Sequence, residues 1–363
     1  MLLFDVPIIP DEGYVSFLRQ RQARLHAVHF GLAAPGVPDA RRCLEPDGPG
    51  GVDAVARALA AVPAPRKYAL LNSRFHHPDR YGDAAFLGGL ADTLERLQGD
   101  GLLHGIVFAD CYLLAALAAA RPELAARLEA VPSVNCMLDS GPKAVAMLRH
   151  VAQLGFCAPS KVILDRSLNR DLEGLDRAVA MVRAEHPGAC ITLLANEGCL
   201  LHCPFKPAHD AHIALAHLDG SGVACGMPLH RELGCMRAFY RQREYLCSAP
   251  FIRPEDVARY EGRADVVKIC GRTRGGAFLT RAVAAYMDGR FAGNLLELND
   301  ATEPLAQRLW LDNAALPPDF WDMVTRCDKR CASCGVCARL AAAHVREVSA
   351  MPPEPAVFTA CRK

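Results

Sequence analysis

Short runs of apolar and β-branched residues alternate along the chain with longer Ala/Leu/Arg segments whose apolar residues recur every three or four positions. Runs of the first kind predict strands, and segments of the second kind predict amphipathic helices. Eight strands are expected, at residues 25–32, 67–73, 104–110, 133–139, 161–167, 190–196, 245–252 and 264–271. Helices are expected at residues 81–100, 111–130, 141–155, 171–187 and 277–290.

Eight strands alternating with helices predict an α/β fold, a parallel (β/α)8 TIM-like barrel, with a doubly wound open sheet as the alternative. The strand at 245–252 is the least clearly marked, because the residues before it have no clear period. We expect a catalytic barrel at residues 1–300 and a small C-terminal cysteine-rich segment. The remaining divisions are a linker at 301–326, the metal-cluster segment at 327–348 and a tail at 349–363.

Several predicted strands end in polar residues. These are Asn72, Asp110, Asp139, Asp165 with Arg166, and Asn196 with Glu197. In a (β/α)8 barrel the carboxyl ends of the strands carry the active site. The polar strand ends therefore predict a functional site at this end, and Arg166 and Asn196 are expected to bind substrate.

Bulk composition narrows the function classes. The charges of the 41 basic and 40 acidic residues nearly cancel, which argues against binding to nucleic acid or an anionic membrane through net charge. A local basic groove is compatible with this balance. No stretch reaches the about 18–20 apolar residues that span a bilayer. The first residues, "MLLFDVPIIP", do not have the charge pattern of a secretory signal. We expect a cytoplasmic protein with reduced thiols.

The 16 cysteines are too many for routine core positions, and nine of them lie at 199–247 and 327–337. Cys327, Cys331, Cys334 and Cys337 are spaced C-x3-C-x2-C-x2-C. Such a compact run favours an iron–sulfur cluster; zinc and unligated thiols are the alternatives. The first three also match the motif of radical S-adenosylmethionine enzymes. Their position after the barrel and the fourth cysteine argue against that class.

The second group begins with "NEGCLLHCPFKPAHDAH", residues 196–212. Cys199 and Cys203 with His209 and His212 resemble a zinc site, but the spacing between the pairs is shorter than in zinc fingers. A helix begun by Pro207 would place both histidines on one face. Alternatively, Cys199 and Cys203 combine with Cys235 and Cys247 in a four-thiolate site. Cys225 is a lower-ranked substitute.

The segments "NEGCLLHCPF", "SAPFIRPEDV", "VVKICGRTR" and "AVAAYMDGRFAGNLLEL", with the terminal cysteine run, resemble the collagenase-like U32 peptidase family over roughly residues 25–340. The resemblance implies a barrel-like catalytic domain with an iron–sulfur cluster. It also implies oxygen-independent hydroxylation of RNA or a quinone precursor, with prephenate as the implicated oxygen donor. Cys199 and Cys203 match the paired cluster cysteines of the family, and Cys235 matches a later ligand. A cysteine run replaces the C-terminal β-barrel of the RNA-modifying members, which argues against RNA as substrate.

Two residues near the predicted cluster are expected to be catalytic. Glu197 precedes Cys199 and is expected to donate a proton or to lie beside the cluster; a loop-fixing salt bridge is the alternative. Lys268 lies within a predicted strand, where an ammonium needs a partner. Strand alternation would direct it into the barrel toward Asp165 or Asp139, as an internal ion pair or as a ligand for a substrate carboxylate.

Further substrate contacts are expected from basic residues. Arg272 and Arg274 follow the last strand on a glycine-rich turn that leads into a helix, an arrangement that suits carboxylate or phosphate. Arg166 is expected to join them, and His209 is expected on the helix face near the pocket. His76 and His77 lie on another rim loop and are interpreted as surface residues.

Three functional hypotheses follow. The first is an iron–sulfur oxidoreductase, with one or two 4Fe–4S clusters, that modifies a small or carrier-tethered organic substrate bearing a carboxylate. Its expected partners are an electron-donor protein and a related subunit. The second is a U32-type peptidase, although neither G-x-S-x-G nor H-E-x-x-H occurs. The third is a non-catalytic metal or iron–sulfur scaffold or maturation protein.

Overall fold

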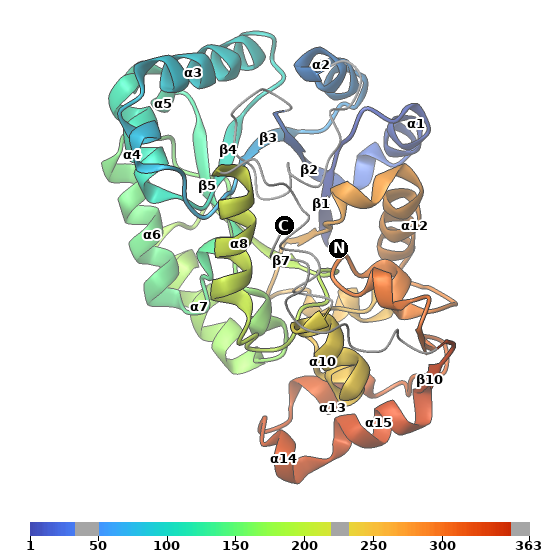
Figure 1. Ribbon diagram of the computed structural model, residues 1–363. Coiled ribbons are helices and arrows are strands. Elements are labelled where there is room, and N and C mark those ends of the chain that lie inside the picture. Colours follow the sequence, from blue (N-terminus) through green and yellow to red (C-terminus); the bar gives the residue numbers. More distant parts are fainter. Residues whose placement is uncertain (33–50, 219–231, 350–363) are drawn as a thin grey trace, which may run out of the picture.

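The computed structural model describes residues 1–32, 51–218 and 232–349. Eight parallel strands form one sheet in the order β5-β4-β3-β2-β1-β8-β7-β6. They are β1 Leu3–Pro7, β2 Leu25–Gly31, β3 Arg66–Leu71, β4 Gly105–Phe108, β5 Glu129–Pro132, β6 Lys161–Ile163, β7 Cys190–Leu194 and β8 Val266–Lys268. Glu129 of β5 also forms a parallel bridge with Cys157, just before β6. The strands thus make a nearly closed (β/α)8 barrel, which confirms the predicted fold class (Figure 1).

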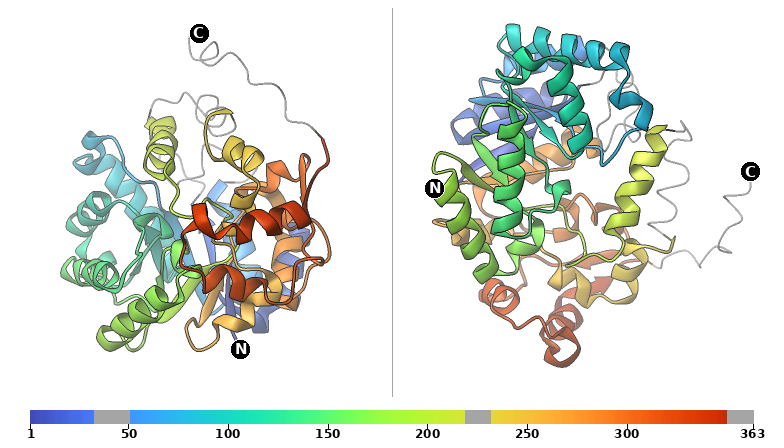
Figure 2. Two further views of the ribbon diagram at one scale, coloured as in Figure 1. Left: turned by 90° about the horizontal axis from the view of Figure 1, so that it is seen from below. Right: turned by 90° about the vertical axis from the view of Figure 1, so that its left-hand side faces the viewer.

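Helices surround the strands, as Figure 2 shows from two sides. They are α1 Glu12–Gln20, α2 Gly51–Ala61, α3 Ala84–Gly99, α4 Cys111–Ala120, α5 Pro122–Ala125, α6 Gly141–Gln153, α7 Leu172–Glu185, α8 Lys206–Leu218 and α12 Gly275–Asp288. Aspartates begin several of them; Asp110, for example, accepts hydrogen bonds from the backbone N–H groups of Tyr112 and Leu113 at the start of α4. No helix in the described ranges is both long and apolar enough to cross a membrane.

Three strands differ from the sequence prediction. Residues 245–252 form no strand, because Glu244–Ser248 are helix α11 and irregular backbone follows. An apolar run this short does not distinguish a buried helix from a buried strand. The eighth strand of the barrel is instead β1, which the sequence analysis did not predict. In addition, β5 begins at Glu129 rather than residue 133, and the 3-10 helix η4 (Val134–Cys136) occupies the predicted position.

The C-terminal part packs against the barrel. Helices α10 (Cys235–Arg241) and α11 and the 3-10 helix η7 (Pro254–Tyr260) precede β8 and α12 in the chain. It then forms η9 Leu295–Leu298, η10 Glu303–Leu305, β9 Leu309–Leu311, α13 Phe320–Thr325, α14 Cys331–Cys334, α15 Val336–His344 and β10 Val345–Glu347. Strands β9 and β10 pair antiparallel.

The segment expected as a linker, 301–326, is therefore ordered structure. The side chains of Leu309 and Phe320 within it are fully buried. Its apolar residues are spaced irregularly between prolines, so neither helical nor strand period reveals them. The expected tail falls almost wholly outside the described residues.

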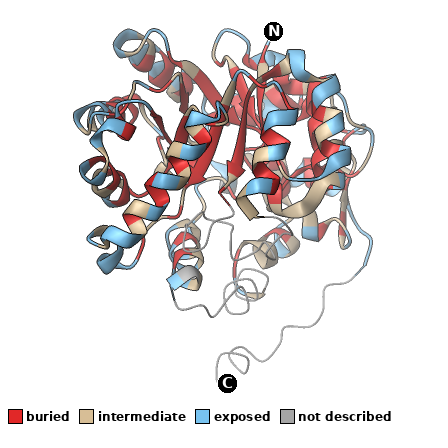
Figure 3. Cartoon of the chain, turned by 90° about the horizontal axis from the view of Figure 1, so that it is seen from above, coloured by how far each residue is buried: buried red, intermediate tan, exposed pale blue. Residues whose placement is uncertain are grey.

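The strands are mostly buried, whereas the outer faces of the helices are exposed (Figure 3). The main core packs the helices against the outside of the barrel. A smaller cluster fills the barrel interior with side chains from successive strands, among them Ala27, Tyr68, Val107, Ile163 and Leu194. Because the interior is filled, the open surface available to a substrate lies at the ends of the strands.

Candidate active site

The loop after β7 carries the first two cysteines of the predicted barrel site. Gly198 in this loop has a φ of 71°, and a Cβ atom there would lie 2.8 Å from the Cβ of Asn299. Glycine is required by both the backbone conformation and the close approach. The turn holds Glu197 and Cys199 at the carboxyl end of the barrel, where βα loops form active sites.

Arg166 is the cation beside this loop. It follows β6 as the first residue of the 3-10 helix η5 (Arg166–Asn169) and is 6% exposed. Its Nη1 lies 2.5 Å from Glu197 Oε2 and donates to Cys199 Sγ at 3.6 Å. Within the part of the chain that the structure describes, its buried Nε and Nη2 have no hydrogen-bond partner. Two adjacent guanidinium donors match the geometry of a carboxylate.

Cys199, Cys203 and Cys235 share one electrostatic environment, although the first two lie in the loop after β7 and Cys235 begins helix α10. Burial raises the pKa of all three thiols, that of Cys235 to about 11. The Cys235 charge raises the pKa of Cys199 further, and the Cys203 charge does the same to Cys235. Arg166 and Lys206 oppose the rise at Cys199 and Cys203. These thiols therefore stay protonated unless a metal replaces the protons.

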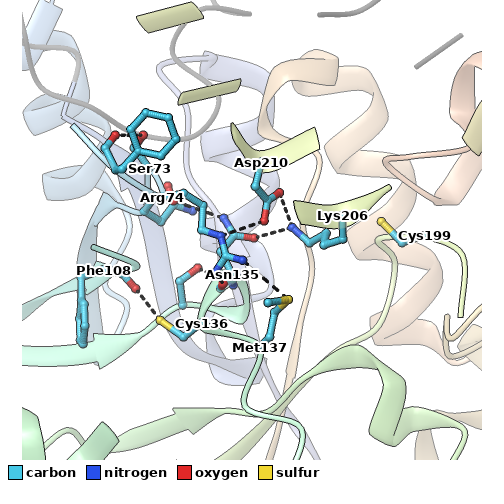
Figure 4. Close-up of polar contacts among 12 residues, drawn as sticks. Ser73, Arg74, Phe108, Asn135, Cys136, Met137, Cys199, Lys206 and Asp210 are labelled. Atoms are coloured by element: carbon cyan, nitrogen blue, oxygen red, sulfur yellow. Dashed lines mark hydrogen bonds and ion pairs between the residues drawn. The ribbon is translucent and has the colours of Figure 1, made fainter. Parts of the chain in front are cut away.

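A cavity of about 140 Å³ lies beside Cys203, and Arg166 and Lys206 also line it. An ion-pair network borders the site (Figure 4). Lys206 Nζ lies 2.5 Å from Asp210 Oδ1 and donates to Asn135 Oδ1 at 3.2 Å. Arg74 Nε lies 3.2 Å from Asp210 Oδ2. The network connects α8 to the loops after β3 and β5.

None of these four residues, Arg74, Asn135, Lys206 and Asp210, was singled out in the sequence. They come from three separate segments, so no local motif unites them. The single signal available was the position of Arg74 just after a predicted strand end, which is where barrel enzymes place site residues.

Asn196 lies where expected, at the end of β7, but its side chain is fully engaged. Its Nδ2 donates to the carbonyl oxygens of Cys270 and Leu298 at 3.0 and 2.9 Å, and its Oδ1 accepts from the Cys270 N–H at 2.7 Å. The amide thus ties the end of β7 to the end of β8. Substrate binding by this side chain would require these bonds to break.

The other predicted substrate contacts are spread around the rim. Arg272 is buried and Arg274 half-buried on the 3-10 helix η8 (Arg272–Arg274). Arg274 faces two acids, at 3.3 Å from both Asp300 Oδ1 and Glu303 Oε2. His209 lies half-buried on α8. The structure thus brings Arg166 to the thiols, and it engages Arg274 with carboxylates of the protein itself.

Lys268 points into the barrel and forms an internal ion pair, but not with the expected partners. Its Nζ lies 3.3 Å from Asp5 Oδ2 and 3.0 Å from His29 Nδ1. Lys161 Nζ lies 2.5 Å from the same Asp5 oxygen. Burial lowers the pKa of Lys268 to about 8, although Asp5 raises it. Burial also lowers the pKa of His29 to about 3.

The expected partners of Lys268 have other contacts. Asp139 lies 2.9 Å from Lys143 Nζ, and Asp165 accepts from the Ser167 N–H at 2.8 Å. Asp5 was missed because its strand was missed. An acid between apolar residues in "LFDVP" was the available signal, since a buried carboxylate needs a cationic partner.

The four cysteines of the C-terminal run converge. Cys327, Cys331, Cys334 and Cys337 all line one cavity of about 300 Å³. Burial raises the pKa of Cys337 to about 11, and the charges of the other three thiols add to the rise. The run therefore presents four soft donors to one space.

Cys247, expected at the barrel site, lies at this second group instead. It is fully buried on α11. Burial raises the pKa of its thiol most, and the charge of Cys337 is the next largest cause. The reason is the helical fold of α11, which packs beside α15. A strand at 245–252 would have carried Cys247 into the barrel wall. Cys225 lies outside the described residues.

Donor chemistry decides which metal centres these groups fit. In residues 1–32, 51–218 and 232–349, no three His, Cys, Asp or Glu side chains already meet in metal-binding geometry. The donors are nevertheless thiols beside cations at the barrel mouth and four thiols around one cavity at the C-terminal run. Soft thiolates suit iron–sulfur clusters and zinc. The residues present fit either group once deprotonated.

The structure buries a histidine at the rim, His76, that the sequence analysis interpreted as a surface residue. His76 is 5% exposed, and its Nδ1 lies 2.7 Å from Asp110 Oδ2, which also accepts from the Tyr81 hydroxyl at 2.7 Å. The carboxylate fixes the proton on Nδ1, so Nε2 is the basic nitrogen. Nε2 is buried without a hydrogen-bond partner among the described residues. This pair has the geometry of an oriented general base.

Comparison with known proteins gives a partial match. No protein-family model matches the chain. An uncharacterized protease of Methanocaldococcus jannaschii is 31% identical over 182 residues, which cover 50% of this chain and 52% of that protein. The chain thus spans about half the length of this curated relative.

Two solved structures are similar at low identity. A U32 peptidase is 17% identical, with a TM-score of 0.46 over 74% of this chain and 92% of that chain. An orotidine 5'-monophosphate decarboxylase from Sulfolobus solfataricus is 10% identical, with a TM-score of 0.33 over 53% of this chain and 77% of that chain. The sequence similarity therefore extends to a protein named as a protease.

Proposed function

We propose that the protein is an enzyme of the U32 peptidase kind whose active site lies at the carboxyl end of the barrel, around Arg166 and the three neighbouring thiols. The sequence similarity to the Methanocaldococcus jannaschii protein, which is named as an uncharacterized protease, supports an enzyme. The position of the group supports an active site, because βα loops at this end carry the chemistry of barrel enzymes.

The finer proposal is an iron–sulfur oxidoreductase. Its main support is the association of Cys199, Cys203 and Cys235 with Arg166, which binds one thiol and one carboxylate. Three thiolates would hold a cluster and leave one iron for a substrate or another ligand. When bound, such a cluster supplies electron transfer and activation of a substrate oxygen.

The chain's own residues define what such an enzyme would bind. Arg166 has two unpartnered donors, so a substrate carboxylate would bind there bidentately. Glu197, which now pairs with Arg166, would be released by that carboxylate and would hold a proton beside the site. Redox modification of a carboxylate-bearing organic molecule, such as oxygen-independent hydroxylation, is the function that this arrangement supports best.

The C-terminal run would hold a second cluster, or zinc. Four thiols around one cavity would complete the coordination of a cubane and leave no iron open. A complete centre suits electron relay from a donor protein, whereas zinc there would be structural.

Peptide hydrolysis is the second candidate, and the name of the relative favours it. In that case the His76–Asp110 pair is the residue set to test, because the orientation of the imidazole by a carboxylate is what activation of a water molecule requires. Substrates would be peptides, and neither cysteine group would act on them directly.

Metal analysis separates the two candidates. The protein is purified anaerobically, and iron, sulfide and zinc are measured in the wild type and in Cys199→Ala, Cys235→Ala and Cys334→Ala. Cys190→Ala at the start of β7 is the control. Two cubanes predict about eight irons, with about four lost in each variant except the control. Zinc alone, with no visible absorption, would contradict the redox proposal.

Hydrolysis is assayed in parallel with a quenched fluorescent peptide library. Activity in a metal-free sample that disappears in His76→Gln but persists in Cys199→Ala would support the peptidase. No hydrolysis by any preparation would contradict it.

A further inference from the structure

A second cavity, of about 660 Å³, lies outside the barrel between α12 and the 3-10 helix η7. Its lining includes Arg253, Glu255, Arg281 and Asn313, and half-buried Phe291 supplies an apolar surface. The volume is in the range of small-molecule sites. None of its lining residues belongs to the barrel-mouth site described above.

Two arginines give the cavity unpartnered donors. Arg253 is 7% exposed, and neither its Nε nor its Nη1 makes a hydrogen bond within the described chain. Its Nε lies 3.5 Å from Glu255 Oε2 and 3.6 Å from Asp256 Oδ2, beyond good hydrogen-bond distance. Arg281 Nε is also buried without a partner among the described residues. Buried guanidinium donors of this kind call for an anion.

Two acceptors are left over in the same lining. Glu255 Oε1 accepts from the Phe291 N–H at 2.7 Å and from Asn313 Nδ2 at 2.9 Å. In contrast, Glu255 Oε2 and the buried Asn313 Oδ1 have no hydrogen-bond partner among the described residues. The last turn of α12 also lines the cavity, and a helix C-terminus favours positive charge.

We propose that this cavity binds a small zwitterion, a free α-amino acid or a short peptide. The carboxylate binds Arg253 and Arg281, the ammonium group binds Glu255 and Asn313, and an apolar side chain packs on Phe291. Such a ligand satisfies the leftover donors and acceptors together, which a simple anion does not. The site is independent of the reaction at the barrel mouth.

Isothermal titration calorimetry of the full chain tests this site. The ligands are the standard amino acids, a set of dipeptides, the deaminated carboxylate of each amino acid that binds, and inorganic phosphate. Saturable binding of an amino acid or a dipeptide is expected. Comparison of these two ligand sets shows whether the site prefers a free amino acid or a short peptide. Arg281→Gln should weaken it about tenfold or more, since it removes a charged hydrogen-bond donor.

Glu255→Gln is the sharper variant. Its amide oxygen retains the bonds to Phe291 and Asn313. Arg253 loses the Glu255 charge but keeps Asp256 at 3.6 Å as a carboxylate partner. This variant should lower the affinity for the amino acid about tenfold or more, and it should leave the affinity for the deaminated carboxylate unchanged. The control is Arg177→Gln, whose side chain is 72% exposed on α7. Absence of saturable amino acid or dipeptide binding, equal binding of phosphate, or affinities unchanged in both cavity variants would overturn the proposal.

Discussion

At the residue scale, Arg166 and Glu197 depend on each other. Both side chains are nearly buried, at 7% and 11% exposure, and each neutralises the other. Arg166→Met leaves the Glu197 carboxylate buried and unpaired, so the free energy of unfolding should fall by about 3–5 kcal/mol. Urea denaturation of the metal-free protein measures this loss.

The double variant Arg166→Met/Glu197→Gln is the control for that mechanism. It removes the stranded charge, and it should be more stable than Arg166→Met alone. A double variant less stable than the single one would contradict a charge-pairing role.

Lys268 predicts an unusual dependence of stability on pH. Its pKa is lowered to about 8 in the folded barrel, whereas an unfolded lysine titrates near about 10.4. Between these values the unfolded chain binds the extra proton, so this residue's contribution to stability rises with pH. The unfolding free energy of wild type minus that of Lys268→Met should therefore increase from about pH 8 to about pH 10. Lys143→Met, at a side chain 48% exposed, is the control for loss of a lysine outside the barrel interior.

The same residue shows what the sequence left open at this scale. An ammonium inside a strand already required a partner, and the internal ion pair was one of the two expectations. The identity of the partner depended on β1, which brings Asp5 beside both lysines. Cys247 moved to the second thiol group for a similar reason, because its segment is helical.

At the element scale, ion pairs connect α8 to the barrel. Lys206 and Asp210 lie one turn apart on this helix, and Arg74 reaches Asp210 from the loop after β3. Asp210→Asn keeps the shape but removes the charge that both cations share. Hydrogen exchange in α8 should accelerate roughly tenfold or more.

Asp176→Asn on α7 provides the comparison, because it removes a more exposed ion pair with Arg263 and leaves α8 untouched. Mass spectrometry of peptides covering 206–218 measures both variants. Equal exchange in α8 for Asp210→Asn and wild type would show that apolar packing alone holds the helix.

Long periodic helices were predictable, and short apolar runs were not. The helices α3, α6 and α7 lie within the expected ranges, and α12 begins two residues before its expected start at residue 277. In contrast, residues 245–252 fit a buried strand as well as a helix by composition, and packing of α11 beside α15 decided between them.

At the scale of the whole molecule, the C-terminal segment belongs to the core. Leu309, Phe320 and Trp321 are 4% exposed or less. A chain ending at residue 300 should lose these contacts, expose their partners and aggregate or melt at a lower temperature. A chain ending at residue 349 retains these contacts and should melt at a higher temperature than the chain ending at residue 300. Differential scanning fluorimetry compares them, and equal melting of all three would restore the linker interpretation.

The sequence by itself predicted the barrel and the gathering of the four C-terminal cysteines at one place. Strand and helix periods repeat regardless of distant contacts, and close cysteine spacing places the C-terminal donors together on one short segment. Tertiary structure alone decided which distant residues meet. It joined Arg166 to Cys199, Asp5 to Lys268 and Cys247 to Cys337, because each pair comes from segments whose approach depends on strand order and packing.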